Sequence, residues 1–215
     1  MRIEIWSDVI CPWCGLGQHR LDAALAAFAD RGEVEVVHRS FELDPSFPAG
    51  KVISAPELLR TKYRLDDAQI AAATGRIEAL AASDGLTPYN VGNNVVGNTR
   101  LAHELLAMAA DHGMEAEAWK RLYRAYFGEG RSIFDVDSLA ALGQELGLGR
   151  DAVREALSTG RYTATVRADG AAAKALGCTG VPFVVIDGKF RIAGAQATGV
   201  FRSTIERAWA SRAIT

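Results

Sequence analysis

The chain has 215 residues, of which 49% are hydrophobic and 23% charged, and its formal net charge at pH 7 is −2. A nearly neutral chain without a basic run lacks the general attraction that brings proteins to nucleic acids or anionic membranes. No apolar stretch approaches the roughly 20 residues of a membrane-spanning helix. The expected first strand begins too early to leave room for a secretory leader. We therefore expect a globular protein of the cytoplasm, with neither a nucleic-acid nor a membrane partner.

The N-terminal segment predicts a strand, a helix and a second strand. Arg2–Ser7 alternates apolar and polar residues, as a half-buried strand does. From Pro12 onward the apolar residues fall near one helical face, up to a break at residues 30–32. Val34–Leu43 is rich in branched and aromatic residues, and Asp44-Pro45 ends it. Together these segments predict a βαβ unit with a right-handed crossover.

The middle of the chain is too long for a loop in a compact domain. Thr87–Asn98, rich in Pro, Gly and Asn, is expected to be a long loop, and Asp151–Gly177 to return the chain to the sheet. Apolar residues elsewhere recur at helical spacing. The expected helices are Leu58–Tyr63, Ala68–Ala82, Thr99–Asp111, Ala116–Phe127 and Asp137–Leu146.

The C-terminal end predicts a hairpin followed by a helix. Phe183–Ile186 and Lys189–Ile192 flank Asp187-Gly188, and an Asp-Gly pair between apolar runs favours a tight hairpin turn. A last helix is expected around Thr198–Ala210. The two ends of the chain therefore supply βαβ and ββα, which is the outline of a thioredoxin fold.

The fold class that we predict is α/β, a thioredoxin fold interrupted by a large all-helical insertion. Residues 1–50 and 162–215 are expected to form the thioredoxin-like domain, and residues 51–161 the helical insertion domain.

The Cys-Pro-Trp-Cys motif of residues 11–14 stands between the first strand and the first helix. Cys11 is expected at the N-cap and Pro12 at the first helical position, where a missing N–H costs nothing. The free N–H groups and the positive end of the helix dipole would stabilise a Cys11 thiolate. We therefore expect Cys11 to be the surface-facing, attacking sulfur and Cys14, more buried, to resolve the mixed disulfide.

Two other uses of cysteine were weighed. A Cys-x-x-Cys pair is also half of a zinc site, but the chain has no second such pair and no paired histidines at ligand spacing, so no metal is expected. Cys178 lies four residues before Pro182. It could be a third redox thiol, but buried and inert is the expected state of a lone cysteine.

Gly180-Val181-Pro182 stands just before the expected hairpin. A proline that opens a strand is compatible with an edge position or with a cis bond. With the dithiol present we favour a cis Val181–Pro182 bond, which would leave the Val181 backbone free to pair with an extended substrate. The alternative is a trans proline that merely begins the strand.

Several residues near the motif are weaker candidates. Trp13 is expected to be exposed enough to contact substrate together with Pro12. Asp8 could relay protons or tune the cysteine pair, and capping of local N–H groups is an equally good explanation. His19 is expected on a solvated helix face, two turns from Cys11 and too far to be its base.

Residues of the expected insertion could face a cleft. Asn98 and Thr99 most simply cap the helix that follows them, whereas Arg100 and His103 could face the cleft. An aromatic stripe could line a groove, although helix–helix core is the commoner use of such a stripe. The stripe consists of Trp119, Tyr123, Tyr126 and Phe127.

The arrangement of these motifs resembles the DsbA family of thioredoxin-fold oxidoreductases over nearly the whole chain. Four local strings are similar to the cytoplasmic FrnE-like branch: Phe41-Glu42-Leu43-Asp44-Pro45, Asn98-Thr99-Arg100-Leu101-Ala102-His103, Ala125-Tyr126-Phe127 and Gly194-Ala195-Gln196. The resemblance implies a thiol–disulfide oxidoreductase that acts on a protein or small-molecule substrate. It holds no bound cofactor besides the redox-active Cys11–Cys14 pair, and glutathione is a candidate electron partner.

Two other functions stay open at this point. One is a glutathione-dependent transferase of the kappa class or a 2-hydroxychromene-2-carboxylate isomerase-type enzyme, relatives that resemble this chain but typically have serine at the position of Cys11 and lack Cys14. The other is a binding or chaperone module, which needs no such motif. The presence of both thiols favours the oxidoreductase. Substrate, direction of electron flow, any role in a polyketide pathway and oligomeric state are left open by the sequence.

Overall fold

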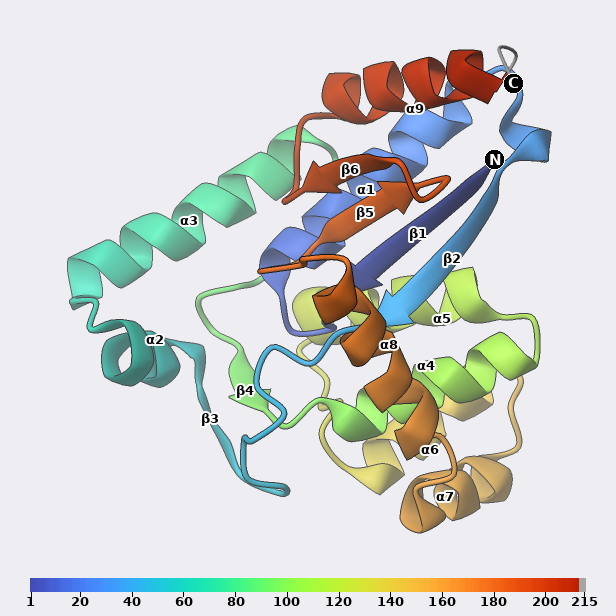
Figure 1. Cartoon of the computed structure of the whole chain (residues 1–215). Coiled ribbons are helices and arrows are strands. Elements are labelled where there is room, and N and C mark those ends of the chain that lie inside the picture. The colour runs from blue at the N-terminus through green and yellow to red at the C-terminus, as the bar shows by residue number, and fades with distance from the viewer. Residues whose placement is uncertain (213–215) are drawn as a thin grey trace.

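A computed structural model describes residues 1–212 of the chain, and its centre is a four-stranded sheet (Figure 1). The strands are β1 (Arg2–Ser7), β2 (Glu35–Ser40), β5 (Phe183–Ile186) and β6 (Phe190–Ala193). Their order is β2-β1-β5-β6; β1 runs parallel to β2 and antiparallel to β5, and β5 and β6 form the antiparallel hairpin. The expected α/β class and the C-terminal hairpin are confirmed.

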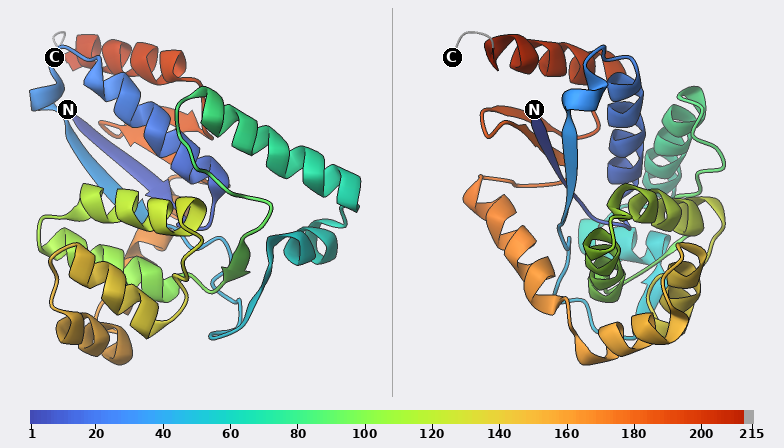
Figure 2. Two further views of the ribbon diagram at one scale, coloured as in Figure 1. Left: turned by 180° about the vertical axis from the view of Figure 1, so that it is seen from behind. Right: turned by 90° about the vertical axis from the view of Figure 1, so that its right-hand side faces the viewer.

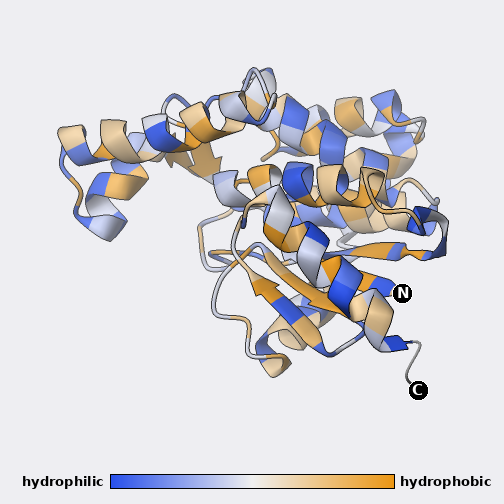
Figure 3. Cartoon of the chain, turned by 90° about the horizontal axis from the view of Figure 1, so that it is seen from above, coloured by the Kyte–Doolittle hydropathy of each residue, from blue (hydrophilic) through white to orange (hydrophobic). Residues whose placement is uncertain are grey.

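Helices cover both faces of this sheet (Figures 1 and 2). On one face lie α1 (Pro12–Ala26) and α9 (Thr198–Arg212), and on the other lies α8 (Thr163–Ala175). Alternate strand residues point to opposite faces, and the strands are largely hydrophobic in Figure 3. Among the side chains buried beneath α1 and α9 are Ile3, Ile5, Val184 and Ile186; those beneath α8 are Trp6, Phe183 and Val185.

The insertion between β2 and α8 is mostly helical, as expected. Its elements are β3 (Val52–Ser54), α2 (Ala55–Tyr63), α3 (Asp67–Ser83), β4 (Val95–Gly97), α4 (Arg100–Asp111), α5 (Glu115–Tyr123), α6 (Val136–Glu145) and α7 (Arg150–Thr159). A π-helical segment, Arg124–Gly128, continues α5. Strand β4 lies inside the expected loop Thr87–Asn98, and its antiparallel pairing with β3 was not predicted. Strands of three residues are too short to show an alternating pattern.

The division of the chain into ranges 1–50 with 162–215 and 51–161 stays a prediction, and residues 213–215 of it lie outside the described residues. In the described part of the chain, 1–212, the structure contains no helix that is both long and apolar enough to span a membrane.

Strand β2 ends earlier than predicted, at Ser40 instead of Leu43. The Phe41 N–H still bonds to the carbonyl of Ser7, at 2.9 Å. The Leu43 N–H then turns to the side chain of Asp8, which it reaches at 2.7 Å. The last residues of the apolar run therefore leave the sheet because a buried carboxylate competes for their backbone.

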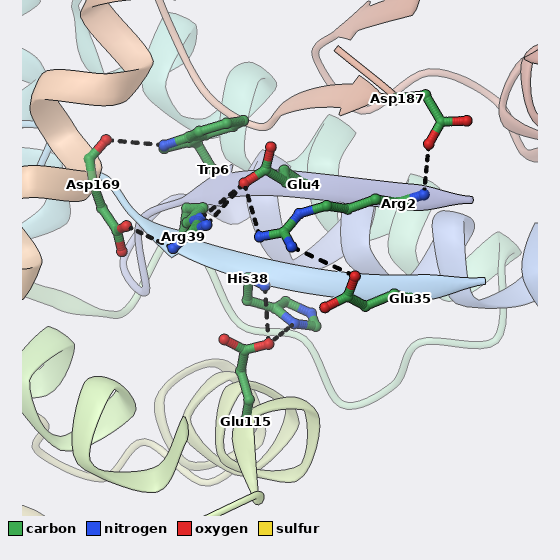
Figure 4. A network of polar contacts seen from close by, with 9 residues as sticks. All are labelled: Arg2, Glu4, Trp6, Glu35, His38, Arg39, Glu115, Asp169 and Asp187. Carbon is green, nitrogen blue, oxygen red and sulfur yellow. Dashed lines mark hydrogen bonds and ion pairs between the residues drawn. The ribbon is translucent and has the colours of Figure 1, made fainter. Parts of the chain in front are cut away.

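Polar contacts fasten the flanking helices to the edge strand β2 (Figure 4). Asp169 of α8 accepts hydrogen bonds from Ser40 N at 3.0 Å and from Arg39 Nη1 at 3.2 Å. Its backbone carbonyl accepts a bond from Trp6 Nε1 at 2.9 Å. On the opposite side of β2, Glu115 of α5 accepts from His38 N at 3.1 Å. These bonds hold α5 and α8 against β2, the neighbour of the strand β1 that leads to the dithiol.

We expect Asp169→Ala to lower the free energy of unfolding by about 1–3 kcal/mol, because the buried Ser40 N–H and the Arg39 guanidinium each lose a hydrogen-bond acceptor. Urea unfolding of both proteins measures this. The control is Asp137→Ala, which removes a 76%-exposed carboxylate paired with Arg154. An exposed pair contributes only about 0–1 kcal/mol, so equal losses in the two variants would contradict the role of Asp169.

Candidate active site

The two cysteines lie at the N-terminus of α1, as predicted. Cys11 is the N-cap residue, with extended backbone angles (φ −79°, ψ 112°), and Pro12 follows at the first helical position. The Cys11 carbonyl accepts bonds from Cys14 N at 2.9 Å and Gly15 N at 3.3 Å. This first turn brings Cys14 back beneath Cys11, which is the arrangement that an internal disulfide needs.

The two thiols differ in their surroundings. Cys14 is fully buried, whereas Cys11 is 6% exposed, and both are free thiols. Burial raises the pKa of Cys14 well above its ordinary value, and neighbouring Cys11 raises it further. Cys14 is therefore a protonated thiol at neutral pH. Cys11 is less exposed than expected for a surface-facing thiol, because surrounding segments cover most of it. Trp13, at 36% exposed, is the part of the motif most open to solvent.

The loop before β5 lies directly against the first sulfur. The Val181–Pro182 bond is cis, as the sequence suggested. The Cys11 thiol donates to the Val181 carbonyl over 3.7 Å, and its sulfur makes no capping bond to the helix N–H groups. Gly17 makes this approach of loop and helix possible, because a β-carbon there would lie 2.8 Å from Pro182 Cγ.

Asp8, three residues before the motif, is fully buried and joins three segments of the chain. Its carboxylate accepts bonds from Leu43 N at 2.7 Å, from Thr99 Oγ1 at 3.4 Å and from His103 Nε2 at 3.2 Å. Its backbone carbonyl accepts from Cys11 N at 3.1 Å. Of the local N–H groups the side chain accepts that of Ile10, at 3.5 Å, and its other partners lie 35 to 95 positions away. The buried pairing with His103 was not foreseen.

Among the residues around His103, Asn98 caps α4 as the sequence suggested, whereas the others differ from the expectation. His103 is fully buried and does not face a cleft. Thr99 is the N-cap residue of α4, but its hydroxyl bonds to Asp8 and makes no cap bond. The capping bond comes instead from Asn98 Oδ1, which accepts from Arg100 N at 3.0 Å. The Arg100 side chain lies at 3.7 Å from Glu42.

Tyr89 is a neighbour of the dithiol that the sequence analysis missed. Its hydroxyl donates to the carbonyl of Pro12 at 2.6 Å. The absence of a side chain at Gly15 leaves room for this, since a β-carbon there would overlap the Tyr89 hydroxyl. Burial raises the pKa of Tyr89 well above its usual value, and Cys11 adds to this. Tyr89 comes from an irregular segment, where no periodicity reveals which side chain is buried.

The aromatic stripe is largely core, as the commoner use of such a pattern suggested, and Tyr123 also lines a cavity beside α1. Trp119, Tyr123, Tyr126 and Phe127 are all at most 7% exposed. Burial raises the pKa of Tyr123 well above its usual value, with a further contribution from Cys14. The hydroxyls of Tyr123 and Ser7 are both buried without a hydrogen-bond partner in residues 1–212. Tyr123 belongs to the same hydrophobic cluster as Cys14, so this cluster contains buried polar atoms.

The sequence suggested that His19 lies on a solvated helix face, and this prediction is wrong. It is half-buried, and its Nε2 lies 2.8 Å from the carbonyl of Asp84. It also lines a cavity of about 580 Å³ between α1, residues 86–89 and the α5–π-helical segment.

Cys178 is buried as expected, and burial raises its pKa. Its thiol donates to the Gly180 carbonyl at 3.3 Å. It packs with Trp6 and Phe183 under α8, in a cluster separate from the one that contains Cys11 and Cys14.

Timed alkylation of the reduced protein at neutral pH is expected to modify Cys11 at least about tenfold faster than Cys14 or Cys178, since a protonated, buried thiol is a poor nucleophile. The alkylating reagent is iodoacetamide. Peptide mass spectrometry of samples in which this reaction is quenched at successive times measures the three rates. In denaturant the three rates should converge. Equal labelling of Cys11 and Cys14 in the folded protein would contradict the assigned difference.

Replacing Asp8 by alanine is expected to lower the free energy of unfolding by about 3 kcal/mol, because the buried donors of Thr99 and His103 and the part-buried Leu43 N–H lose their acceptor. Asp8→Asn should cost less, since its amide oxygen can still accept from Leu43 N. Urea denaturation of the two variants compares them. A loss for Asp8→Ala no larger than for Asp8→Asn would show that these bonds do not stabilise the junction.

Comparison with known proteins agrees with this geometry. Residues 2–206 match the model of the DSBA-like thioredoxin domain. A probable DsbA oxidoreductase from Streptomyces coelicolor is 40% identical in sequence, with a TM-score of 0.94 over 98% of this chain and 90% of that one.

Two further solved structures share the fold at lower identity. A 2-hydroxychromene-2-carboxylate isomerase is 17% identical, with a TM-score of 0.72 over 99% of this chain and 98% of its own. The cytosolic disulfide reductase DsbM from Pseudomonas aeruginosa, solved also with GSH, is 21% identical, with a TM-score of 0.63 over 96% of this chain and 98% of its own. The thioredoxin fold with a helical insertion is therefore confirmed, and the chain belongs to the DsbA-like thioredoxin-domain family.

Proposed function

We propose that this protein is a thiol–disulfide oxidoreductase of the FrnE-like branch, in which Cys11 attacks and Cys14 resolves. The observation that carries the proposal is the placement of both thiols in the first turn of α1, with the Val181 carbonyl 3.7 Å from the Cys11 sulfur. A dithiol at a helix N-terminus, beside the backbone of the half-buried Val181, has the parts needed for disulfide exchange.

The exchange takes two steps. The Cys11 thiolate attacks one sulfur of a substrate disulfide, and the other substrate sulfur leaves as a thiolate that takes up a proton. Cys14 then loses its proton, attacks the Cys11 sulfur and releases the second substrate thiol. Two electrons pass to the substrate and a Cys11–Cys14 disulfide remains. Oxidation of a substrate dithiol follows the same steps in reverse.

We assign substrate contact to Pro12, Trp13, Val181 and Pro182. Trp13 is the exposed residue of the motif. The Val181 carbonyl bonds to the Cys11 thiol in the reduced form. A thiolate cannot donate this bond, so ionisation of Cys11 frees the carbonyl to accept from a substrate backbone N–H.

The proposed compartment is the cytoplasm, and the proposed electron partner is glutathione. Apart from the motif the chain has one cysteine, Cys178, which is buried and free, so no structural disulfide has to be maintained. The structure of DsbM with GSH, a protein of the same fold, supports glutathione as a candidate.

A glutathione-dependent transferase or isomerase is the alternative, because the isomerase shares the fold. Such chemistry uses one activated sulfur, that of glutathione, and requires no resolving thiol. A buried Cys14 beneath Cys11 favours the oxidoreductase.

Equilibration in a series of glutathione redox buffers distinguishes these functions. We expect one two-electron transition confined to Cys11 and Cys14, with a midpoint between about −270 and −120 mV. Alkylation and mass spectrometry count the thiols at each potential, and Cys178→Ser should show the same midpoint. A stable glutathione adduct on Cys11 without an internal disulfide would favour the transferase.

Removal of the resolving thiol is expected to trap the first intermediate. Cys14→Ser should accumulate mixed disulfides through Cys11 because the second step has no nucleophile, whereas Cys11→Ser should form none. Non-reducing electrophoresis followed by mass spectrometry detects them. A Cys14→Ser protein that captures no thiol from peptide or small disulfides would count against the proposed mechanism.

A further inference from the structure

The cavity beside α1 has the size of a small-molecule site. Its volume of about 580 Å³ falls in the range of about 300–1,000 Å³ that ligand pockets occupy. A second cavity, near Ile10 and Lys62, measures only about 80 Å³. Residues that line the larger cavity come from α1, from α5 and from the segment that follows α3. Figure 2 (left) shows these three parts of the chain facing the viewer.

This cavity follows the helical face that leads to the attacking cysteine. Gly15, Gln18, His19 and Asp22 line it from α1. Residues spaced by three, four and seven positions share one face of a helix, and Cys11 precedes Gly15 by four. Cys11 itself is the N-cap residue, with an extended backbone, and does not line the cavity; the Gly15 end of the cavity is the end nearer to the dithiol.

The wall opposite α1 is apolar and aromatic. It includes Leu86, Pro88, Tyr89 and Tyr123. Tyr89 is stacked on Phe127, with ring centroids 4.5 Å apart, so its ring is held in place. The Tyr89 hydroxyl is bonded to the Pro12 carbonyl, which connects this wall to the dithiol turn. Flat aromatic molecules suit such a surface, because rings prefer offset or edge-on contact with other rings.

The rim offers cations that can leave their present partners. Arg124 is 78% exposed and bonds to Glu129 at 3.2 Å. Glu129 keeps two other partners, since Arg121 contacts both of its oxygens and Arg131 lies at 3.4 Å. Arg124 is thus a surplus cation at the mouth of the cavity, and an exposed pair of this kind costs little to break.

Lys120 is in a similar position. It is 60% exposed and pairs with Asp22 at 3.0 Å. Asp22 also accepts from Gln18 Nε2 at 2.9 Å, so it retains a partner when Lys120 turns away. The rim can therefore present two positive charges to an anionic group while the cavity holds an apolar ring.

We propose that this cavity is a substrate subsite for small aryl disulfides that carry a carboxylate. The inference rests on the proposed function and names its substrate class. The ring packs against the Tyr89 wall of the cavity, the carboxylate meets Arg124 and Lys120, and the disulfide extends past Gly15 toward Cys11. Reduced protein and one aryl disulfide give the Cys11–Cys14 disulfide and two aryl thiols, which balances two electrons and two protons.

Single-turnover reduction of three probe disulfides tests this. The probes are 5,5′-dithiobis(2-nitrobenzoate), 4,4′-dithiodipyridine, which is aryl but uncharged, and hydroxyethyl disulfide, which is aliphatic. All proteins carry Cys178→Ser, so that only the motif thiols react. Each variant is compared with its parent for every probe, because the probes differ in intrinsic reactivity.

Filling the cavity should discriminate against both aryl probes. Gly128→Leu places a side chain beside Pro88 with only ordinary contacts, since its β-carbon lies 3.4 Å from the Pro88 carbonyl. We expect the ratio of aryl to aliphatic rate constants to fall about tenfold, a typical effect of a methylene-scale misfit in a pocket. Thr87→Trp fills the cavity from the segment that packs against Gly128 and replaces Gly128→Leu if that variant does not fold. Unchanged ratios would overturn the proposal.

Removing the rim cation should affect the charged probe alone. Arg124→Gln is expected to slow the dinitrobenzoate probe about threefold relative to dithiodipyridine, as loss of an exposed ion pair does. Equal slowing of both aryl probes would overturn the role of Arg124. The matched controls are Gly75→Leu, at an exposed helix position with nothing within 4 Å, and Arg202→Gln, an exposed partner of Glu206 on α9.

Binding of a sulfur-free probe separates this inference from the proposed function. Titration of the protein with 4-nitrobenzoate, followed by NMR of the backbone amides, should give saturable shifts at residues 86, 87, 89 and 124, lost in Gly128→Leu. The same compound should inhibit reduction of the dinitrobenzoate probe competitively. Disulfide exchange without binding at millimolar probe would overturn the subsite, whereas binding without any exchange would overturn the proposed function and leave the cavity a ligand site.

Discussion

The buried carboxylate of Asp8 is the constraint on which the rest of the site depends. A charge or a proton donor in a core is stable only when its hydrogen bonds are made, and the partners of Asp8 come from the loop after β2 and from α4. Satisfying one side chain therefore requires the sheet and the insertion to meet at the end of β1. The dithiol begins three residues later, with its first N–H bonded to the Asp8 carbonyl.

The insertion is thus part of the active site and not an appendage to the sheet. Cys11 and Cys14 belong to a single hydrophobic cluster with side chains of α3, α4, α5 and α6. This placement buries the Cys14 thiol and raises its pKa. It also covers most of Cys11, which is 6% exposed, whereas Trp13 is 36% exposed.

The sequence alone predicted the parts of the site that depend on local rules. The cap position of Cys11, the Gly-Val-Pro loop and the hairpin turn each follow from the backbone requirements of Pro, Gly and Asp. It did not predict that Asp8 pairs with His103 or that Tyr89 contacts Pro12, because these contacts join residues separated by 95 and 77 positions. His19 was misplaced for the same reason, since its partner is a backbone carbonyl of another helix end.

The glycines at 15 and 17 make α1 intrinsically weak where it carries the dithiol. Each costs a helix interior roughly 1 kcal/mol relative to alanine, and both are required by close neighbours, the Tyr89 hydroxyl and Pro182. The first turns of α1 are consequently held by the insertion and by the loop before β5, more than by their own helix propensity. Opening of this helix end then occurs in one cooperative event with the release of Tyr89 and the movement of the Val181 loop. The accessibility of Cys14 is therefore set by the local stability of a contact between three distant segments of the chain.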